Sequence, residues 1–209
     1  MLGMIKKDLY LMLNNRRLFY IVLVLYLGMS ILGGQDYTLF IPFMLLMMFL
    51  TSFSYDDFNS WHGYGAVLPQ GRENYVKGKY VTVIVLSVVS CFFSLLLSFL
   101  IGSIKHEGNL MDSLSILAGI TGAMLLLISI LFPIIFKFGY EKGRIALFIV
   151  SFGISGIVIF LGTFFQTRIP ESLILFLEKY GIYLAALITI AMLYVSYRIS
   201  RKIYLNKEL

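Results

Sequence analysis

Six long apolar runs constrain this chain more than any other feature of its sequence. An α-helix needs about 20 apolar residues to cross the roughly 30 Å hydrocarbon core of a bilayer, and only helices or closed barrels can span it. Hydrophobic residues make up 59% of the chain and charged residues 13%, against about a quarter charged in ordinary globular proteins. We therefore predict an all-α polytopic membrane protein, with a single transmembrane domain over residues 1–209. The six transmembrane helices are expected at approximately Leu18–Leu32, Thr38–Phe53, Val81–Ile104, Ser113–Phe136, Ile145–Phe165 and Gly181–Ser200.

The lysines and arginines alternate between the two sides of these spans. The six spans form pairs at 18–54, 81–136 and 145–200, and a tail follows at 201–209. Fourteen of the 17 cations fall on one side, and three fall on the other. Because cytoplasmic loops carry the excess of Lys and Arg, both termini are predicted to be cytoplasmic. The fourteen are Lys6, Lys7, Arg16, Arg17, Arg72, Lys77, Lys79, Lys137, Lys142, Arg144, Arg198, Arg201, Lys202 and Lys207, and the three are Lys105, Arg168 and Lys179.

Residues 1–17 precede the first span and carry a helical pattern of their own. Leu2, Ile5, Leu9 and Met12 recur at helical spacing, with cationic side chains off that stripe. This pattern predicts a helix lying in the cytoplasmic membrane interface. The alternative is a frayed, solvated leader. The first span lacks a small-x-small cleavage site, so we interpret it as a retained helix rather than a signal peptide.

The longest polar stretch, at 55–80, follows the second span. Phe58, Trp61 and Tyr64 lie three residues apart, which predicts a short amphipathic helix that Pro69 then breaks. From Arg72 onward the chain can start the helix that runs into the third span. Mixed charge beside exposed aromatic residues is typical of a protein-binding surface. An aromatic belt in the headgroup region would explain some of these residues, but not the length of the stretch.

Two short motifs resemble catalytic elements but lack the residues that catalysis needs. Gly33-Gly34-Gln35 resembles the tail of an ATP-binding-cassette signature, yet it falls in a predicted external turn, and the chain has no GxxxxGK[ST] phosphate loop. Gly153-Ile154-Ser155-Gly156 resembles the GxSG of rhomboid proteases, but neither His62 nor His106 lies in a span to act as the base. Cys91 is the only cysteine, so no cysteine metal cluster or internal disulfide is expected. We predict no enzymatic activity and no metal site for this chain.

The polar residues of the predicted spans allow two further interpretations. No acidic residue lies within a span as drawn, which argues against proton-coupled transport. Four serines of the third span could face an amphipathic substrate or could simply bond their own helix, and both interpretations stay open: Ser87, Ser90, Ser94 and Ser98. Small residues of the fifth span are predicted to form a helix–helix contact between two copies: Ser151, Gly153 and Gly156.

The order of these features resembles the ABC-2 type permeases, the membrane half of many bacterial exporters. That family shares the interfacial helix, the tight first hairpin, the long cytoplasmic loop after the second span and six helices. Its loop carries an acidic residue, a W-x-x-Y element, Leu-Pro, an Arg and a Lys-Tyr. The corresponding residues here are Asp57, Trp61, Tyr64, Leu68, Pro69, Arg72, Lys79 and Tyr80.

The resemblance implies a partner and a location. Such permeases sit in the bacterial cytoplasmic membrane as dimers and work with a separate ATPase, which binds ATP and Mg²⁺, so this chain itself would need no cofactor. The loop after the second span would supply the coupling helix. The residues expected to contact the ATPase are Asp57, Trp61, Tyr64, Pro69, Arg72 and Tyr75.

The resemblance also bears on the substrate. The external segment between the fifth and sixth spans, roughly Gln166–Tyr180, is short, whereas relatives that extrude sterols or drugs often carry a larger domain there. The compact form is similar to permeases of phenol-soluble modulin exporters and lantibiotic immunity systems, which implies an amphipathic or hydrophobic substrate such as a peptide. The competing hypothesis is a non-enzymatic immunity or scaffold protein that acts without an ATPase.

Overall fold

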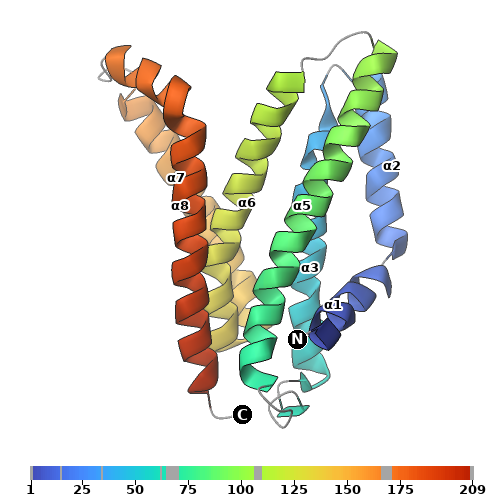
Figure 1. Ribbon diagram of the computed structural model, residues 1–209, viewed down its shortest axis with the longest axis vertical. Coiled ribbons are helices and arrows are strands. Elements are labelled where there is room, and N and C mark those ends of the chain that lie inside the picture. The colour runs from blue at the N-terminus through green and yellow to red at the C-terminus, as the bar shows by residue number, and fades with distance from the viewer. Residues whose placement is uncertain are drawn as a thin grey trace. The chain divides into compact units, whose positions relative to one another are not determined.

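A computed structural model describes residues 2–14, 16–33, 35–61, 63–64, 71–105, 110–165 and 171–207 of the chain. These residues form helices and turns, and no β-strand occurs among them, so the predicted all-α fold is confirmed. Figure 1 shows the order of the helices along the chain. The helices are α1 (Leu2–Asn14), α2 (Arg16–Leu32), the 3-10 helix η1 (Tyr37–Phe40), α3 (Ile41–Phe58), α5 (Gly71–Lys105), α6 (Leu110–Phe138), α7 (Tyr140–Phe165) and α8 (Glu171–Leu205).

Several helices are suited to a bilayer. Within the described residues, four are long and apolar enough to cross a membrane: Tyr37–Phe58, Gly71–Lys105, Met111–Phe138 and Tyr180–Leu205. A shorter apolar helix covers Phe19–Leu32. Helices α2 and α7 occupy the positions of the first and fifth predicted spans. The total of six spans remains a prediction.

The helices extend beyond the apolar runs. Helix α3 continues to Phe58 rather than ending at Phe53, and α5 begins at Gly71 rather than at Val81. The 35 residues of α5 would reach about 52 Å at 1.5 Å per residue, well beyond the hydrocarbon thickness. Since residues 71–80 are the polar part of this helix, its first turns are the part that best fits outside the hydrocarbon.

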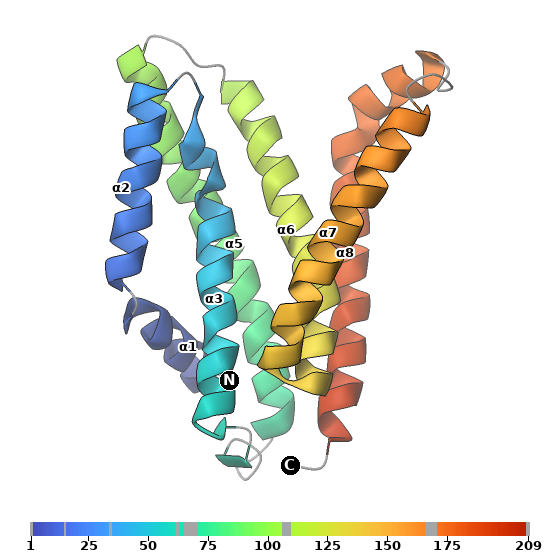
Figure 2. The ribbon, with the colours of Figure 1, turned by 180° about the vertical axis from the view of Figure 1, so that it is seen from behind.

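The structure divides into two compact units, Met1–Met124 with Tyr204–Leu209, and Leu125–Ile203. In the first unit, α3 and α5 pack against each other, α1 packs on both, and η1 packs on α2 and α5. Figures 1 and 2 show α1 lying obliquely across α3 and α5 near one end of this unit. Large apolar side chains from α3 and α5 fill the interface, and Leu46, Phe49, Val76 and Val83 are almost fully buried.

A tight turn joins α2 to η1 at the other end of the first unit. The Gly33 amide donates to Met29 O at 2.7 Å and closes α2, and the Tyr37 amide donates to Ser30 Oγ at 2.7 Å. Asp36 caps η1 by accepting from the Thr38 amide at 3.1 Å. Lys105 Nζ, at the end of α5, donates to Gly33 O. This geometry agrees with the predicted hairpin and gives Gly33 a role in turning the chain.

In the second unit, one residue separates α6 from α7. Gly139 has a φ of 86°, and its amide donates to Ile135 O at 2.8 Å. This left-handed conformation favours glycine because a Cβ would meet the following carbonyl oxygen. Gly143 then lies against the Ile135 side chain, where a Cβ would collide. The predicted loop at 137–144 is therefore much shorter, since α6 and α7 run to either side of Gly139.

Candidate functional site

A buried ion cluster lies where α1, the end of α3 and the start of α5 meet. Lys79 of α5 is only 1% exposed. Its Nζ lies 3.0 Å from Asp8 Oδ1 of α1, 2.8 Å from Asp56 Oδ2 of α3 and 2.8 Å from Ser52 Oγ. An ammonium group has three protons to donate, so these three acceptors satisfy it. We call Lys7, Asp8, Asp56 and Lys79 the ion cluster.

The second lysine makes the cluster neutral. Lys7 Nζ pairs with Asp56 Oδ1 and lies 3.3 Å from Asp8 Oδ1. The Tyr75 hydroxyl donates to Asp56 Oδ2 at 2.8 Å. Two cations thus face two anions, and the Asp56 carboxylate accepts from three side chains. Buried charges are tolerated only with such pairing and hydrogen bonding.

Aromatic rings enclose the two ammonium groups. Lys79 Nζ lies 4.4 Å from the ring centroid of Phe53, and Lys7 Nζ lies 4.6 Å from that of Trp61. Cations at this distance over a ring face are attracted to its negative quadrupole. The Tyr75 ring stacks on the ring of Tyr204, which lies in the last turn of α8, and the two ring centroids are 5.1 Å apart. The cluster is thereby adjacent to residues from four helices.

The predicted coupling residues lie around this cluster in different surroundings. Tyr75 is 2% exposed and part of the core, and Asp57 is half-buried in the last turn of α3. Arg72, in the first turn of α5, donates from Nη1 to Leu205 O at 3.2 Å and Lys207 O at 3.3 Å. Pro69 lies outside the described residues. Arg72 therefore binds the carbonyls at the end of α8.

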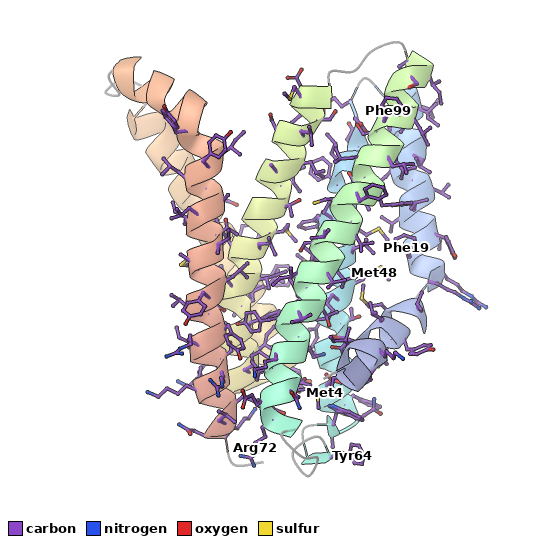
Figure 3. The ribbon with its side chains drawn as sticks, viewed as in Figure 1. Met4, Phe19, Met48, Tyr64, Arg72 and Phe99 are labelled. Atoms are coloured by element: carbon purple, nitrogen blue, oxygen red, sulfur yellow. The ribbon has the colours of Figure 1, made fainter. Side chains whose placement is uncertain are left out.

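The aromatic residues Phe58, Trp61 and Tyr64 of the polar stretch 55–80, which we call the coupling segment, are more accessible than Tyr75. Residues 61, 63 and 64 have helical backbone. Trp61 is half-buried with its ring 5.1 Å from that of Tyr64, and Tyr64 is 62% exposed. Phe58, at the end of α3, is 88% exposed. Figure 3 places Tyr64 and Arg72 at the same end of the first unit as Met4, with Phe99 at the opposite end.

The sequence pattern did not predict that the four residues of the ion cluster contact one another. In the sequence Lys79 is one of the cations that predict topology, and Asp56 falls near the start of the polar stretch 55–80. Asp8 carried a usable signal: together with Met4 and Met12 it recurs every four residues, and all three are buried on one face of α1. A carboxylate on the apolar face of a helix predicts a buried cationic partner.

The four serines of α5 are buried in the first unit. Ser87 and Ser90 donate to Val83 O and Ser87 O of their own helix at 2.8 and 2.9 Å. Ser94 donates to Thr38 O at 2.9 Å, and Ser98 donates to Ser113 Oγ at 3.3 Å. These bonds favour helix packing over a substrate-facing stripe.

The small residues of α7 lie on an open face of the second unit. Gly153 and Gly156 are exposed, and a Cβ added to either would meet nothing within 4 Å among the described atoms. Ser151 is half-buried, and its carbonyl accepts from Ser155 Oγ at 2.8 Å. The predicted contact between two copies through this face stays a prediction.

The sequence was compared with known proteins. A profile of the ABC-2 family transporter proteins matches residues 3–205. No curated protein sequence and no solved structure matched the chain. The profile match covers nearly every residue, and the all-helical fold with several membrane-length helices agrees with it. The chain therefore belongs to the ABC-2 family of transporter proteins, the membrane components of ATP-binding-cassette transporters.

Proposed function

We propose that this chain is the permease subunit of an ATP-binding-cassette exporter in a bacterial cytoplasmic membrane. In this proposal two copies form the translocation path with six spans each and both termini in the cytoplasm. A separate ATPase subunit binds and hydrolyses ATP with Mg²⁺. The observation that carries the proposal is the match of residues 3–205 to the ABC-2 family. The ion cluster adds a mechanical basis, because it joins α1, α3 and α5 and lies beside Trp61 of the coupling segment.

The ion cluster can transmit a movement of α3 to α1 and α5. Lys79 of α5 is bonded to α1 through Asp8 and to α3 through Asp56. Separating such a buried pair would leave an uncompensated charge, which costs several kcal/mol. The parts of α1, α3 and α5 that carry these residues therefore move together more readily than they move apart. A displacement of the last turn of α3 would be passed to both α1 and α5.

The surface next to the cluster suits a protein partner. Phe58, the last residue of α3, and Tyr64, which follows the helix, expose large aromatic faces. Interface energy concentrates in a few aromatic and arginine side chains. Trp61 and Arg72 belong to the same surface, but they also contact Lys7 and the end of α8 within the chain. Replacing those two would disturb the permease itself, so Phe58 and Tyr64 give the cleaner test of docking.

The proposed substrate is amphipathic or hydrophobic, with a peptide as the leading class. Only residues 166–170 separate α7 from α8, which leaves no room for an external domain between them. Helix α8 begins at Glu171, so residues 171–180 of the predicted external segment Gln166–Tyr180 are helical. The short connection between α7 and α8 supports direct release of the substrate, because it leaves no separate external domain to which the substrate would first bind.

Co-purification tests the proposal. The tagged chain, expressed in its own host and extracted in mild detergent, should retain an ATP-binding-cassette ATPase that mass spectrometry identifies. The purified complex in lipid nanodiscs should hydrolyse ATP, and the tagged chain alone should not. Absence of any ATPase from a chain that still protects cells against an amphipathic peptide would contradict the proposal and favour the immunity or scaffold hypothesis.

A further inference from the structure

A cavity of about 680 Å³ lies at the bend between α1 and α2, and Tyr10, Leu13, Arg16 and Arg17 line it. Helix α1 ends at Asn14 and α2 begins at Arg16. Both arginines are exposed, as are Tyr10 and Leu13. We call this cavity, with its four lining residues, the elbow cavity.

All the side-chain charge in the described lining of the elbow cavity is positive. Its described lining contains two guanidinium groups and no carboxylate, and the first turn of α2 has no acidic residue. The N-terminus of a helix already carries a partial positive charge, so cations there are unfavourable unless an anion is present. Asp8, on the same helix as Tyr10, is committed to Lys79 and Lys7. Arg16 and Arg17 thus each present a fork-shaped guanidinium group suited to a phosphate oxygen.

An apolar surface continues from the cavity along α2. Arg17, Ile21 and Val24 are exposed and follow at spacings of four and three residues, which places them on one helix face. The 17 residues of α2 reach about 25 Å, close to the hydrocarbon thickness. Figures 1 and 2 show that α2 begins well short of the end of the unit where α3 ends. The arginines therefore fit the level of the headgroups, and Ile21 and Val24 fit the level of the acyl chains.

We propose that the elbow cavity binds one anionic phospholipid, with its phosphate between Arg16 and Arg17 and an acyl chain along Ile21 and Val24. A soluble phosphate would use the arginines but not the adjoining apolar face. Tyr10 and Leu13 complete the site by contacting the headgroup and the glycerol region. This inference does not depend on the exporter assignment, because it concerns only the bend between α1 and α2.

Native mass spectrometry of the detergent-solubilised chain tests the site. The wild-type chain should bind one phosphatidylglycerol at least tenfold more tightly than phosphatidylcholine, and inorganic phosphate at millimolar concentration should not displace it. The variant Arg16→Gln/Arg17→Gln should lose that preference. The control Arg198→Gln/Lys202→Gln removes the same charge from exposed positions on α8 and should keep it.

Three results would overturn the proposal. The first is equal binding of the two lipids by the wild-type chain. The second is an equal loss of the preference for phosphatidylglycerol in both variants, which would indicate diffuse electrostatic attraction. The third is displacement of the lipid by inorganic phosphate. The wild-type comparison requires no variant to fold. The charge-preserving variant Arg16→Lys/Arg17→Lys should retain part of the preference, and its complete loss with intact folding would show that the guanidinium geometry is essential.

Discussion

Lys79 and Lys77 lie two positions apart on α5 and face different surroundings. Lys79 is buried among Asp8, Asp56 and Ser52, whereas Lys77 forms a half-exposed pair with Glu73 at 2.7 Å. Burial changes what a lost ion pair costs. A broken buried pair leaves a desolvated carboxylate, but a broken surface pair leaves a hydrated one.

This contrast gives a matched pair of variants. Lys79→Met should lower the free energy of unfolding by about 3–5 kcal/mol, because the two buried carboxylates of Asp8 and Asp56 would then share a single cation, Lys7. Lys77→Met should lower it by about 0.5 kcal/mol or less. Unfolding in mixed micelles with increasing SDS, followed by circular dichroism, measures both. Equal losses would show that the ion cluster does not stabilise the fold.

Single residues were the hardest level to predict from sequence. The polar stretch could be recognised, and Trp61, Tyr64 and Arg72 do lie at one end of the first unit. The contact of Asp8 with Lys79 joins residues 71 positions apart, and no local pattern determines such a pairing. Tyr75 shows the reverse problem, since an aromatic residue in a polar stretch turned out to be core.

At the scale of helices, hydropathy predicted the bodies of the elements better than their ends. Helices α3 and α5 both continue through polar residues, because helix formation depends on backbone bonds and propensity rather than on apolarity. Hydropathy detects only the apolar part of a helix, which can lie in the hydrocarbon core of the bilayer. Asp56 and Lys79 of the ion cluster lie in these polar extensions, so span boundaries drawn from hydropathy left both residues outside the helices.

The open face of α7 supports a prediction about assembly. Gly153→Leu and Gly156→Leu should lower the dimer fraction in mild detergent severalfold, since a bulky side chain would hold two helices apart. Gly181→Leu on α8 is the control, because a Cβ there also meets nothing within 4 Å. Size-exclusion chromatography with light scattering measures the change. An unaltered dimer fraction in both α7 variants would assign these glycines to another contact.

At the scale of the whole molecule, the distribution of cations predicts which segments share a side of the membrane. The first unit agrees internally with that prediction, because Arg72 contacts the carbonyl of Lys207 whereas Lys105 contacts the turn at Gly33. Which of these ends faces the cytoplasm is a prediction from the excess of Lys and Arg.

Cysteine labelling tests the orientation in intact cells. In a Cys91→Ser background, a cysteine at Gln35, in the predicted external turn between the first two spans, should react with an impermeant thiol reagent added outside. Cysteines at Asn59 and Asn206 should react only after the cells are opened. All three positions are exposed in the structure. The opposite labelling pattern would show that the orientation is reversed, and the surface around Phe58 and Tyr64 would then lie outside the cytoplasm.

The affinity of the permease for its ATPase tests the central claim most directly. The ATPase that co-purifies with the wild-type chain is titrated onto nanodisc-embedded variants, and binding is followed by biolayer interferometry. Phe58→Ala and Tyr64→Ala should each weaken binding by about 2 kcal/mol, roughly thirtyfold, because they remove exposed aromatic anchors beside the ion cluster. Phe92→Ala, at a 71% exposed position in the middle of α5, should bind as the wild type does. Unchanged affinity in both Phe58→Ala and Tyr64→Ala would contradict the account, because the ATPase would then dock elsewhere.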